Sequence, residues 1–284
     1  MANLKEIRNR IASVSSTMQI TSAMKMVSAA KLKKAQDAIT AMRPYADKLT
    51  ELLQNLSATL DADSGSKFSE QRDVKNVLIV AITSNRGLCG AFNSNIIKRA
   101  MVVAESYDAN VSVVAIGKKA NDALSKNFEI ISNQSPVFDD LTFDNVAEIA
   151  EMLMAQFESK AFDKIEVIYN KFKNAATQEI MTEQFLPIVP LEGDANVNLD
   201  YIFEPSKEEI VETLIPKSLK TQLYKSIRDS FASEHGARMT AMHKATDNAT
   251  ELRDQLKLTY NKARQASITN EILEIVGGAE ALNG

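Results

Sequence analysis

An unbroken heptad pattern at the N-terminus is the feature that most constrains the fold of this chain. Residues 1–60 contain no glycine and one proline, Pro44. From Leu4 to Leu60, 14 of the 17 a and d positions of one heptad frame are apolar, and the exceptions are Thr21, Lys25 and Ser28. A register that keeps its phase this far predicts one helix about 86 Å long. A lone helix of that length cannot bury its apolar seam, so it needs a partner.

The C-terminus supplies a matching helix. Residues 217–276 contain one glycine, Gly236, and no proline. We expect a helix from Lys217 to about Leu282, about 99 Å long. Its heptad pattern from Met242 onward is rich in alanine, which lets two backbones approach closely. The compact middle of the chain joins the C-terminal end of the first helix to the N-terminal end of the second. Residues 1–60 and 201–284 are therefore expected to pair as an antiparallel coiled coil.

The middle of the chain alternates between strand and helix patterns. A polar linker at 61–73 precedes the expected strands 74–83, 110–117, 128–132, 163–172 and 178–189. The expected helices are one within 87–107, one at 118–126 and one at 142–159. This alternation predicts a central α/β domain at 74–200, Rossmann-like, with a five-stranded and mainly parallel sheet. The fold class is therefore α/β plus a long antiparallel coiled coil.

Composition excludes several classes of protein. The 284 residues are 45% hydrophobic, which is enough to bury a sizeable core. No run approaches the ~18 apolar residues of a membrane span. The opening MANLKEIRNR lacks the apolar block of a secretory signal. A single cysteine, Cys89, excludes an internal disulfide and a Cys-rich zinc site. Two histidines, His235 and His243, supply a His-based metal site poorly.

Positive charge is concentrated in the N-terminal helix. Residues 1–60 carry nine Lys and Arg against four Asp and Glu, although the whole chain has a net charge of -4. Such a segment favours an acidic protein partner or an anionic surface. Nucleic acid is the weaker alternative, because the chain has no Trp and Tyr45 is the only aromatic residue of the segment. For the lysines near Lys31, a partner contact and plain solvation are about equally favoured. The heptad seam turns polar from Thr21 to Ser28, so we expect this face to meet another protein rather than the C-terminal helix.

Two glycine-containing turns resemble phosphate sites only superficially. The loop SNRGLCGAFN (84–93) follows a strand and precedes a helix, where α/β domains bind phosphates, but it lacks the G-x-G-x-x-G spacing. The segment AIGKK (115–119) lacks the first glycine and the final Ser or Thr of a P-loop. A tight turn that packs the helix on the sheet is the favoured interpretation. Cys89 is expected to be a buried structural thiol rather than a nucleophile.

The end of the C-terminal helix is apolar all round. Seven apolar residues cover most of its circumference: Ile272, Leu273, Ile275, Val276, Ala279, Ala281 and Leu282. A helix end of this kind must be buried, and the N-terminal helix can cover only one side of it. We therefore expect an apolar sleeve supplied by another protein.

Three segments resemble one known family. They are IRNRIASVSSTMQITSAMKMVSAAKLKKAQ (7–36), SNRGLCGAFN (84–93), and ASEHGARMTAMHKATDNA (232–249) followed by YNKARQASITNEILEIVGGA (260–279). Together they are similar to the gamma subunit of bacterial F-type ATP synthase. Gly236 stands where that family usually has alanine, which is expected to loosen the helix slightly. The two extra cysteines of the redox-regulated photosynthetic form are absent, so thiol switching is not expected.

The resemblance implies a central rotor shaft with no catalytic site, cofactor or metal of its own. The shaft would couple proton-driven rotation of the c ring to conformational change at the beta-subunit sites that make or hydrolyse ATP. The implied partners are three alpha and three beta subunits, epsilon and the c ring, with no nucleic acid. The membrane would be met only through the complex, peripherally, at the cytoplasmic face of the bacterial inner (plasma) membrane.

The resemblance also implies where partners touch this chain. Met24 and Lys25 match the region that meets an acidic lever of beta. Arg264 and Gln265 match a pair that contacts a beta loop. Tyr201 and Glu204 match the base that faces the c ring. The apolar end, with Ile272, Leu273, Ile275 and Val276, would sit in the sleeve formed by alpha and beta.

Two rival functions are distinguished by simple properties. A small nucleotide-binding enzyme with helical arms predicts that the isolated chain retains nucleotide specifically. A free-standing coiled-coil tether predicts polar helix ends, which the apolar stretch from Ile272 to Leu282 contradicts.

Overall fold

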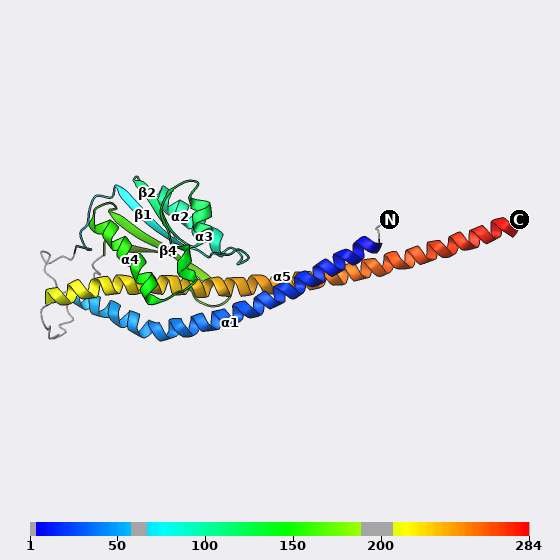
Figure 1. Cartoon of the computed structure of the whole chain (residues 1–284), viewed down its shortest axis with the longest axis horizontal. Helices are drawn as coiled ribbons and strands as arrows, with labels where there is room; N and C mark the ends of the chain where they lie inside the picture. Colours follow the sequence, from blue (N-terminus) through cyan, green and yellow to red (C-terminus); the bar gives the residue numbers. More distant parts are fainter. Residues whose placement is uncertain (1–3, 58–66, 189–206, 284) are drawn as a thin grey trace. The chain divides into compact units, whose positions relative to one another are not determined.

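A computed structural model describes residues 4–57, 67–188 and 207–283. The chain divides into two compact units. The helical unit comprises Met1–Ser28 and Met239–Gly284, and the α/β unit comprises Ala29–Arg238. Two long helices, α1 (Leu4–Ser57) and α5 (Lys207–Asn283), each contribute to both units (Figure 1).

The helical unit is an antiparallel pair of helices. Thr246 hydrogen-bonds the hydroxyl of Thr21 at 2.8 Å. Further along, the Arg8 guanidinium donates to the hydroxyl of Tyr260 at 2.9 Å. Residue numbers fall along α1 as they rise along α5, so the expected antiparallel pairing is confirmed.

The α/β unit is built on a five-stranded sheet. The strands are β1 (Asn76–Ile82), β2 (Asn110–Ile116), β3 (Glu129–Asn133), β4 (Lys164–Phe172) and β5 (Gln178–Leu186). Their order is β3-β2-β1-β4-β5, and only β5 runs antiparallel to its neighbour. The predicted mainly parallel sheet is confirmed, and its order reverses between β1 and β4, as in doubly wound folds.

Helices cover both faces of this sheet. α2 (Phe92–Glu105) and α3 (Lys118–Leu124) pack on one face, with Ile96 and Leu124 fully buried. α4 (Phe143–Glu158), the short 3-10 helix η2 (Ser135–Phe138) and the first part of α5 pack on the other, with Phe157 and Leu223 fully buried. Every residue of β1 from Val77 to Ile82 is buried, because both faces of a parallel sheet are covered.

The heptad prediction identifies the buried side of α1 within the α/β unit. Leu32, Ala35 and Ile39 are each 5% exposed or less, and all three occupy a or d positions. At the far end of the same unit, the Lys217 ammonium lies 5.9 Å from the ring centre of Tyr45, so the antiparallel direction holds here too.

Both long helices contain an internal proline. Pro44 lies within α1, as the single predicted helix requires. α5 begins at Lys207, so the predicted start at Lys217 is wrong and Pro216 also lies inside a helix. A proline removes one backbone hydrogen bond. Burial of the neighbouring Ile215 and Leu219 favours continuation of the helix through this position.

Gly236 has a packing role in α5. A Cβ atom built on this residue would lie 3.1 Å from both the Cα and the carbonyl oxygen of Ala175, in the turn between β4 and β5. The glycine therefore lets the turn approach the helix backbone closely. The sequence suggested only a looser helix at this position, because it could not reveal that contact.

Candidate functional site

The C-terminal end of α5 exposes a continuous apolar surface. Ile272, Leu273, Ile275 and Val276 are 54%, 63%, 72% and 52% exposed. Antiparallel pairing places Tyr260 beside Arg8, and α1 is described only from Leu4. α5 thus extends beyond the described part of α1, and none of the residues that the structure describes covers its apolar end.

Met24 and Lys25 are half-buried on α1 of the helical unit. Three apolar neighbours, Ile20, Met26 and Val27, are 60%, 65% and 58% exposed. Exposed apolar side chains beside a cationic residue make this face a candidate protein-binding surface.

Two polar residues in the heptad seam of α1, Thr21 and Ser28, are buried. The sequence predicted that the helix face from Thr21 to Ser28 meets another protein rather than α5, yet Thr21 and Ser28 are 8% and 2% exposed. Each hydroxyl donates to a carbonyl of its own helix, Thr21 to Met18 and Ser28 to Met24. A hydroxyl satisfied in this way can be buried in a helix seam, so that prediction was wrong for these two residues.

The remaining predicted contacts are spread along the chain. Arg264 and Gln265 are exposed on α5, between the apolar end and Tyr260. Tyr201 and Glu204 lie outside the described residues. The structure therefore does not gather the predicted residues into one pocket; those it describes form separate surfaces along the two helices.

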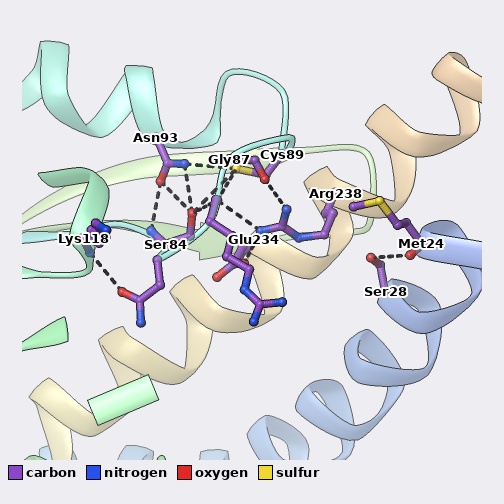
Figure 2. A network of polar contacts seen from close by, with 11 residues as sticks. Met24, Ser28, Ser84, Gly87, Cys89, Asn93, Lys118, Glu234 and Arg238 are labelled. Carbon is purple, nitrogen blue, oxygen red and sulfur yellow. Dashed lines mark hydrogen bonds and ion pairs between the residues drawn. The ribbon is translucent and has the colours of Figure 1, made fainter. Parts of the chain in front are cut away.

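The glycine loop at 84–93 is held by an internal polar network (Figure 2). Asn93 accepts from the backbone N–H of Ser84 at 2.9 Å, and its amide nitrogen lies 3.2 Å from Sγ of Cys89. Cys89 is 1% exposed, and burial raises the pKa of its thiol. This environment is that of an inert structural thiol, as the sequence predicted.

Two residues of the loop adopt left-handed backbone conformations. Leu88 has φ of 64° and Gly90 has φ of 60°. Leu88 is also 66% exposed. A bulky residue in this region is strained, so the surrounding contacts must hold it there.

A buried ion pair on α5 clamps the same loop. The Arg238 guanidinium donates to the carbonyl oxygen of Gly87 and, at 3.3 Å, to that of Arg86, and it pairs with Glu234 at 2.5 Å (Figure 2). Burial raises the pKa of Glu234, and Arg238 opposes that rise. The spacing of four residues in SEHGAR favours such a pair, but the loop carbonyls lie 151 and 152 residues away in sequence and could not be predicted.

The second glycine turn, at Gly117, uses its donors internally. The backbone N–H groups of Lys118 and Ala120 donate to Oδ1 of Asn85 and Oγ1 of Thr83. Lys119 N–H donates to the carbonyl of Ser84 at 3.2 Å. The start of α3 therefore has these donors occupied, which agrees with a packing turn rather than a phosphate site.

The two histidines lie in different surroundings and form no metal pair. His243 is exposed, with Nδ1 3.3 Å from Asp247. His235 is 5% exposed, its ring is edge-on to Phe231, and neither ring nitrogen has a hydrogen-bond partner. Burial, with Lys31 and Arg238 nearby, lowers the pKa of His235 to about 4. Across the described ranges, no group of three or more His, Cys, Asp or Glu could hold a metal ion.

Comparison with known proteins decides the family. The family described as ATP synthase matches residues 3–282. The ATP synthase gamma chains of Flavobacterium psychrophilum and Flavobacterium johnsoniae are 77% and 74% identical over 286 residues, covering 100% of each chain. The chain belongs to the ATP synthase gamma family. A member of the gamma family is a non-catalytic subunit of the central stalk of a rotary ATP synthase.

Solved structures share the fold of this gamma-family chain. An F1/c-ring structure from Euglena gracilis mitochondrial ATP synthase matches with a TM-score of 0.69 at 24% identity, covering 98% of this chain and 94% of that one. A central stalk/c-ring structure from Tetrahymena thermophila matches with a TM-score of 0.60 at 27% identity, covering 80% and 99%. In the part of the chain that the structure describes, no helix has the length and hydrophobicity to cross a membrane.

Proposed function

We propose that this chain is the rotor shaft that couples rotation of a proton-driven c ring to the catalytic sites of beta subunits. Its partners are three alpha and three beta subunits, epsilon and the c ring. The complex lies at the cytoplasmic face of a bacterial inner membrane, and this chain meets the membrane only through it. Membership of the gamma family supports the assembly.

One observation carries the proposal: the apolar end of α5 is exposed among the residues that the structure describes. Ile272, Leu273, Ile275 and Val276 are all more than half exposed on this helix. An isolated helix end of this kind gains free energy by entering an apolar sleeve. A ring of alpha and beta subunits offers such a sleeve, in which the end can turn without losing specific polar contacts.

The mechanism follows from the asymmetry of the shaft. Three identical beta subunits can hold different conformations only if each meets a different side of the shaft. Inverting the population of one site from 1:99 to 99:1 needs about 5.5 kcal/mol of differential interaction. Moving one charge across 100 mV supplies ~2.3 kcal/mol, so several protons are needed per ATP. The shaft transmits that work through its contacts.

Four contact regions are proposed along the shaft. Met24 and Lys25 face the acidic lever of beta, supported by the exposed apolar side chains around them. Arg264 and Gln265, both exposed, contact a beta loop partway up. Ile272, Leu273, Ile275 and Val276 occupy the sleeve. Tyr201 and Glu204, outside the described residues, face the c ring.

Co-purification tests the assembly. The tagged full chain, expressed with the other subunits of its complex, should elute at a native mass that contains one copy beside three alpha and three beta subunits. A matched variant carrying Ile275→Asp and Val276→Asp places two charges in the sleeve and should assemble less well. Full assembly of both forms at equal yield would contradict the sleeve. Elution of the parent chain without alpha and beta subunits, when they are co-expressed, would contradict the rotor.

A further inference from the structure

The edge of the sheet where doubly wound folds bind ligands is occupied here by α5. Strand order reverses between β1 and β4, and ligands of such sheets bind beyond the carboxyl ends of the strands that flank this point. Ser233 of α5 donates to the carbonyl of Asn170 near the end of β4. Arg238 of α5 donates to Gly87, in the loop that follows β1. The helix thus bonds both sides of the switch point.

The loop presents acceptors rather than donors to this position. A phosphate-binding loop points backbone N–H groups at its ligand, whereas the carbonyl oxygens of Arg86 and Gly87 point at the Arg238 guanidinium. The Glu234 carboxylate completes the set at 2.5 Å. Two carbonyls and one carboxylate can each accept from a cation with several donors, and a guanidinium supplies five N–H groups in one plane.

We propose that the carbonyls of Arg86 and Gly87 and the carboxylate of Glu234 form a receptor for one guanidinium group. Arg238 fills that receptor and acts as a positioning residue. It holds the 84–93 loop with Leu88 turned outward and Cys89 turned inward. The receptor is independent of the rotor function proposed above, because all of its atoms belong to this chain.

The burial of the receptor makes its occupancy important to the loop. Arg238 and Glu234 are each 8% exposed, so an empty receptor leaves a buried carboxylate without its main partner. Leu88 stays in its left-handed conformation only while neighbouring contacts hold it. Loss of the guanidinium is therefore expected to release the loop, whereas the core of the sheet keeps its own contacts.

Cys89 provides a specific reporter of loop opening. It is the only cysteine of the chain and is 1% exposed, so a neutral maleimide reaches it only when the loop opens. In the purified full-length chain, Arg238→Ala should speed alkylation of Cys89 about tenfold. Removing a nearby cation raises the thiol pKa and slows alkylation, so a faster rate reports exposure rather than acidity.

A matched arginine on the same helix controls for general loosening. Arg228 donates to the carbonyl of Leu141 at 2.7 Å, outside the 84–93 loop. Arg228→Ala should leave the alkylation rate of Cys89 unchanged. Arg238→Lys keeps the charge but not the planar guanidinium group, so the alkylation rate of Cys89 should rise only about threefold over that of the parent chain. Circular dichroism establishes whether each variant is folded. If Arg238→Ala does not fold, the alkylation rate of Arg238→Lys is compared with that of the parent chain instead.

Chemical rescue separates a receptor from an ordinary packing contact. Guanidinium or methylguanidinium at millimolar concentration should slow alkylation in Arg238→Ala towards the rate of the parent chain, while potassium at equal ionic strength should not. The Arg238→Lys and Arg228→Ala chains should not respond. Equal rates in Arg238→Ala and the parent, equal acceleration by Arg228→Ala, or absence of rescue would each overturn the proposal.

Discussion

Cys89 illustrates how a reactive residue type becomes structural. Its thiol lies beside Asn93, between two left-handed residues, and burial raises its pKa. Cys89→Ala should therefore leave the ATPase activity of the assembled complex largely unchanged. Loss of the buried sulfur should cost about 1 kcal/mol and lower Tm by about 2–4 °C. The exposed Ser94→Ala is the control, and complete loss of activity in a fully assembled complex would refute the structural role.

His235 makes stability depend on pH. Its pKa falls from 6.5 to about 4 on folding, so the folded chain favours the neutral ring. Above pH 6.5 the ring is neutral in both states and the free energy of unfolding is unaffected. As the pH falls from 6.5 towards 4, the unfolded chain binds the proton first, and the free energy of unfolding falls by a total of about 3 kcal/mol. Besides burial, Lys31 from α1 and Arg238 from α5 are the charged groups that lower the pKa of His235.

Urea unfolding at pH 7.5 and pH 5 measures the contribution of His235. The parent chain should lose more stability between these values than His235→Gln, which removes the titrating ring. The exposed His243→Gln should behave as the parent does. An identical pH dependence in the parent and in His235→Gln would show that another group is responsible.

At the scale of elements, the α/β alternation and the heptad seam were predictable because each is a local periodic pattern. The start of α5 was not predictable from the sequence, because a proline normally marks a helix boundary whereas Pro216 lies inside this helix. The burial of Thr21 and Ser28 was missed because the heptad pattern counts them as polar, whereas their hydroxyls donate hydrogen bonds to backbone carbonyls of their own helix. The Arg238 clamp joins parts of the chain too far apart in sequence for any local pattern.

The same element-scale contacts predict that the α/β unit does not bind ATP. Arg238 occupies the switch point after β1, and the backbone of Gly117 packs so closely on Thr83 that a Cβ at Gly117 would clash with the carbonyl oxygen of Thr83. The isolated chain should neither hydrolyse ATP nor bind it at micromolar concentration in equilibrium dialysis. Saturable binding that is abolished by changing Gly87 or Gly90 would instead favour a nucleotide-binding enzyme.

For the whole molecule, the central question is how contact strength sets coupling. Each contact of a rotating shaft must form and break, so one that is too strong traps a single angle. Met24 is half-buried beside exposed Ile20 and Val27, on the face proposed to meet the acidic lever of beta. A cation at this position would add a partly buried charge pair of about 1–3 kcal/mol. That is a sizeable part of the ~5.5 kcal/mol needed to invert one site.

Met24→Lys and Met24→Arg should therefore assemble and hydrolyse ATP while pumping fewer protons per ATP. The number of protons pumped per ATP hydrolysed is measured in membrane vesicles, with pumping and hydrolysis followed in the same sample. Met24→Leu is the matched control, because it keeps the apolar volume and adds no charge, and its coupling should equal that of the parent. Raising the salt concentration should partly restore coupling in the charged variants, since screening weakens the added pair. If pumping and hydrolysis fall in proportion, or neither changes, Met24 does not face the beta lever.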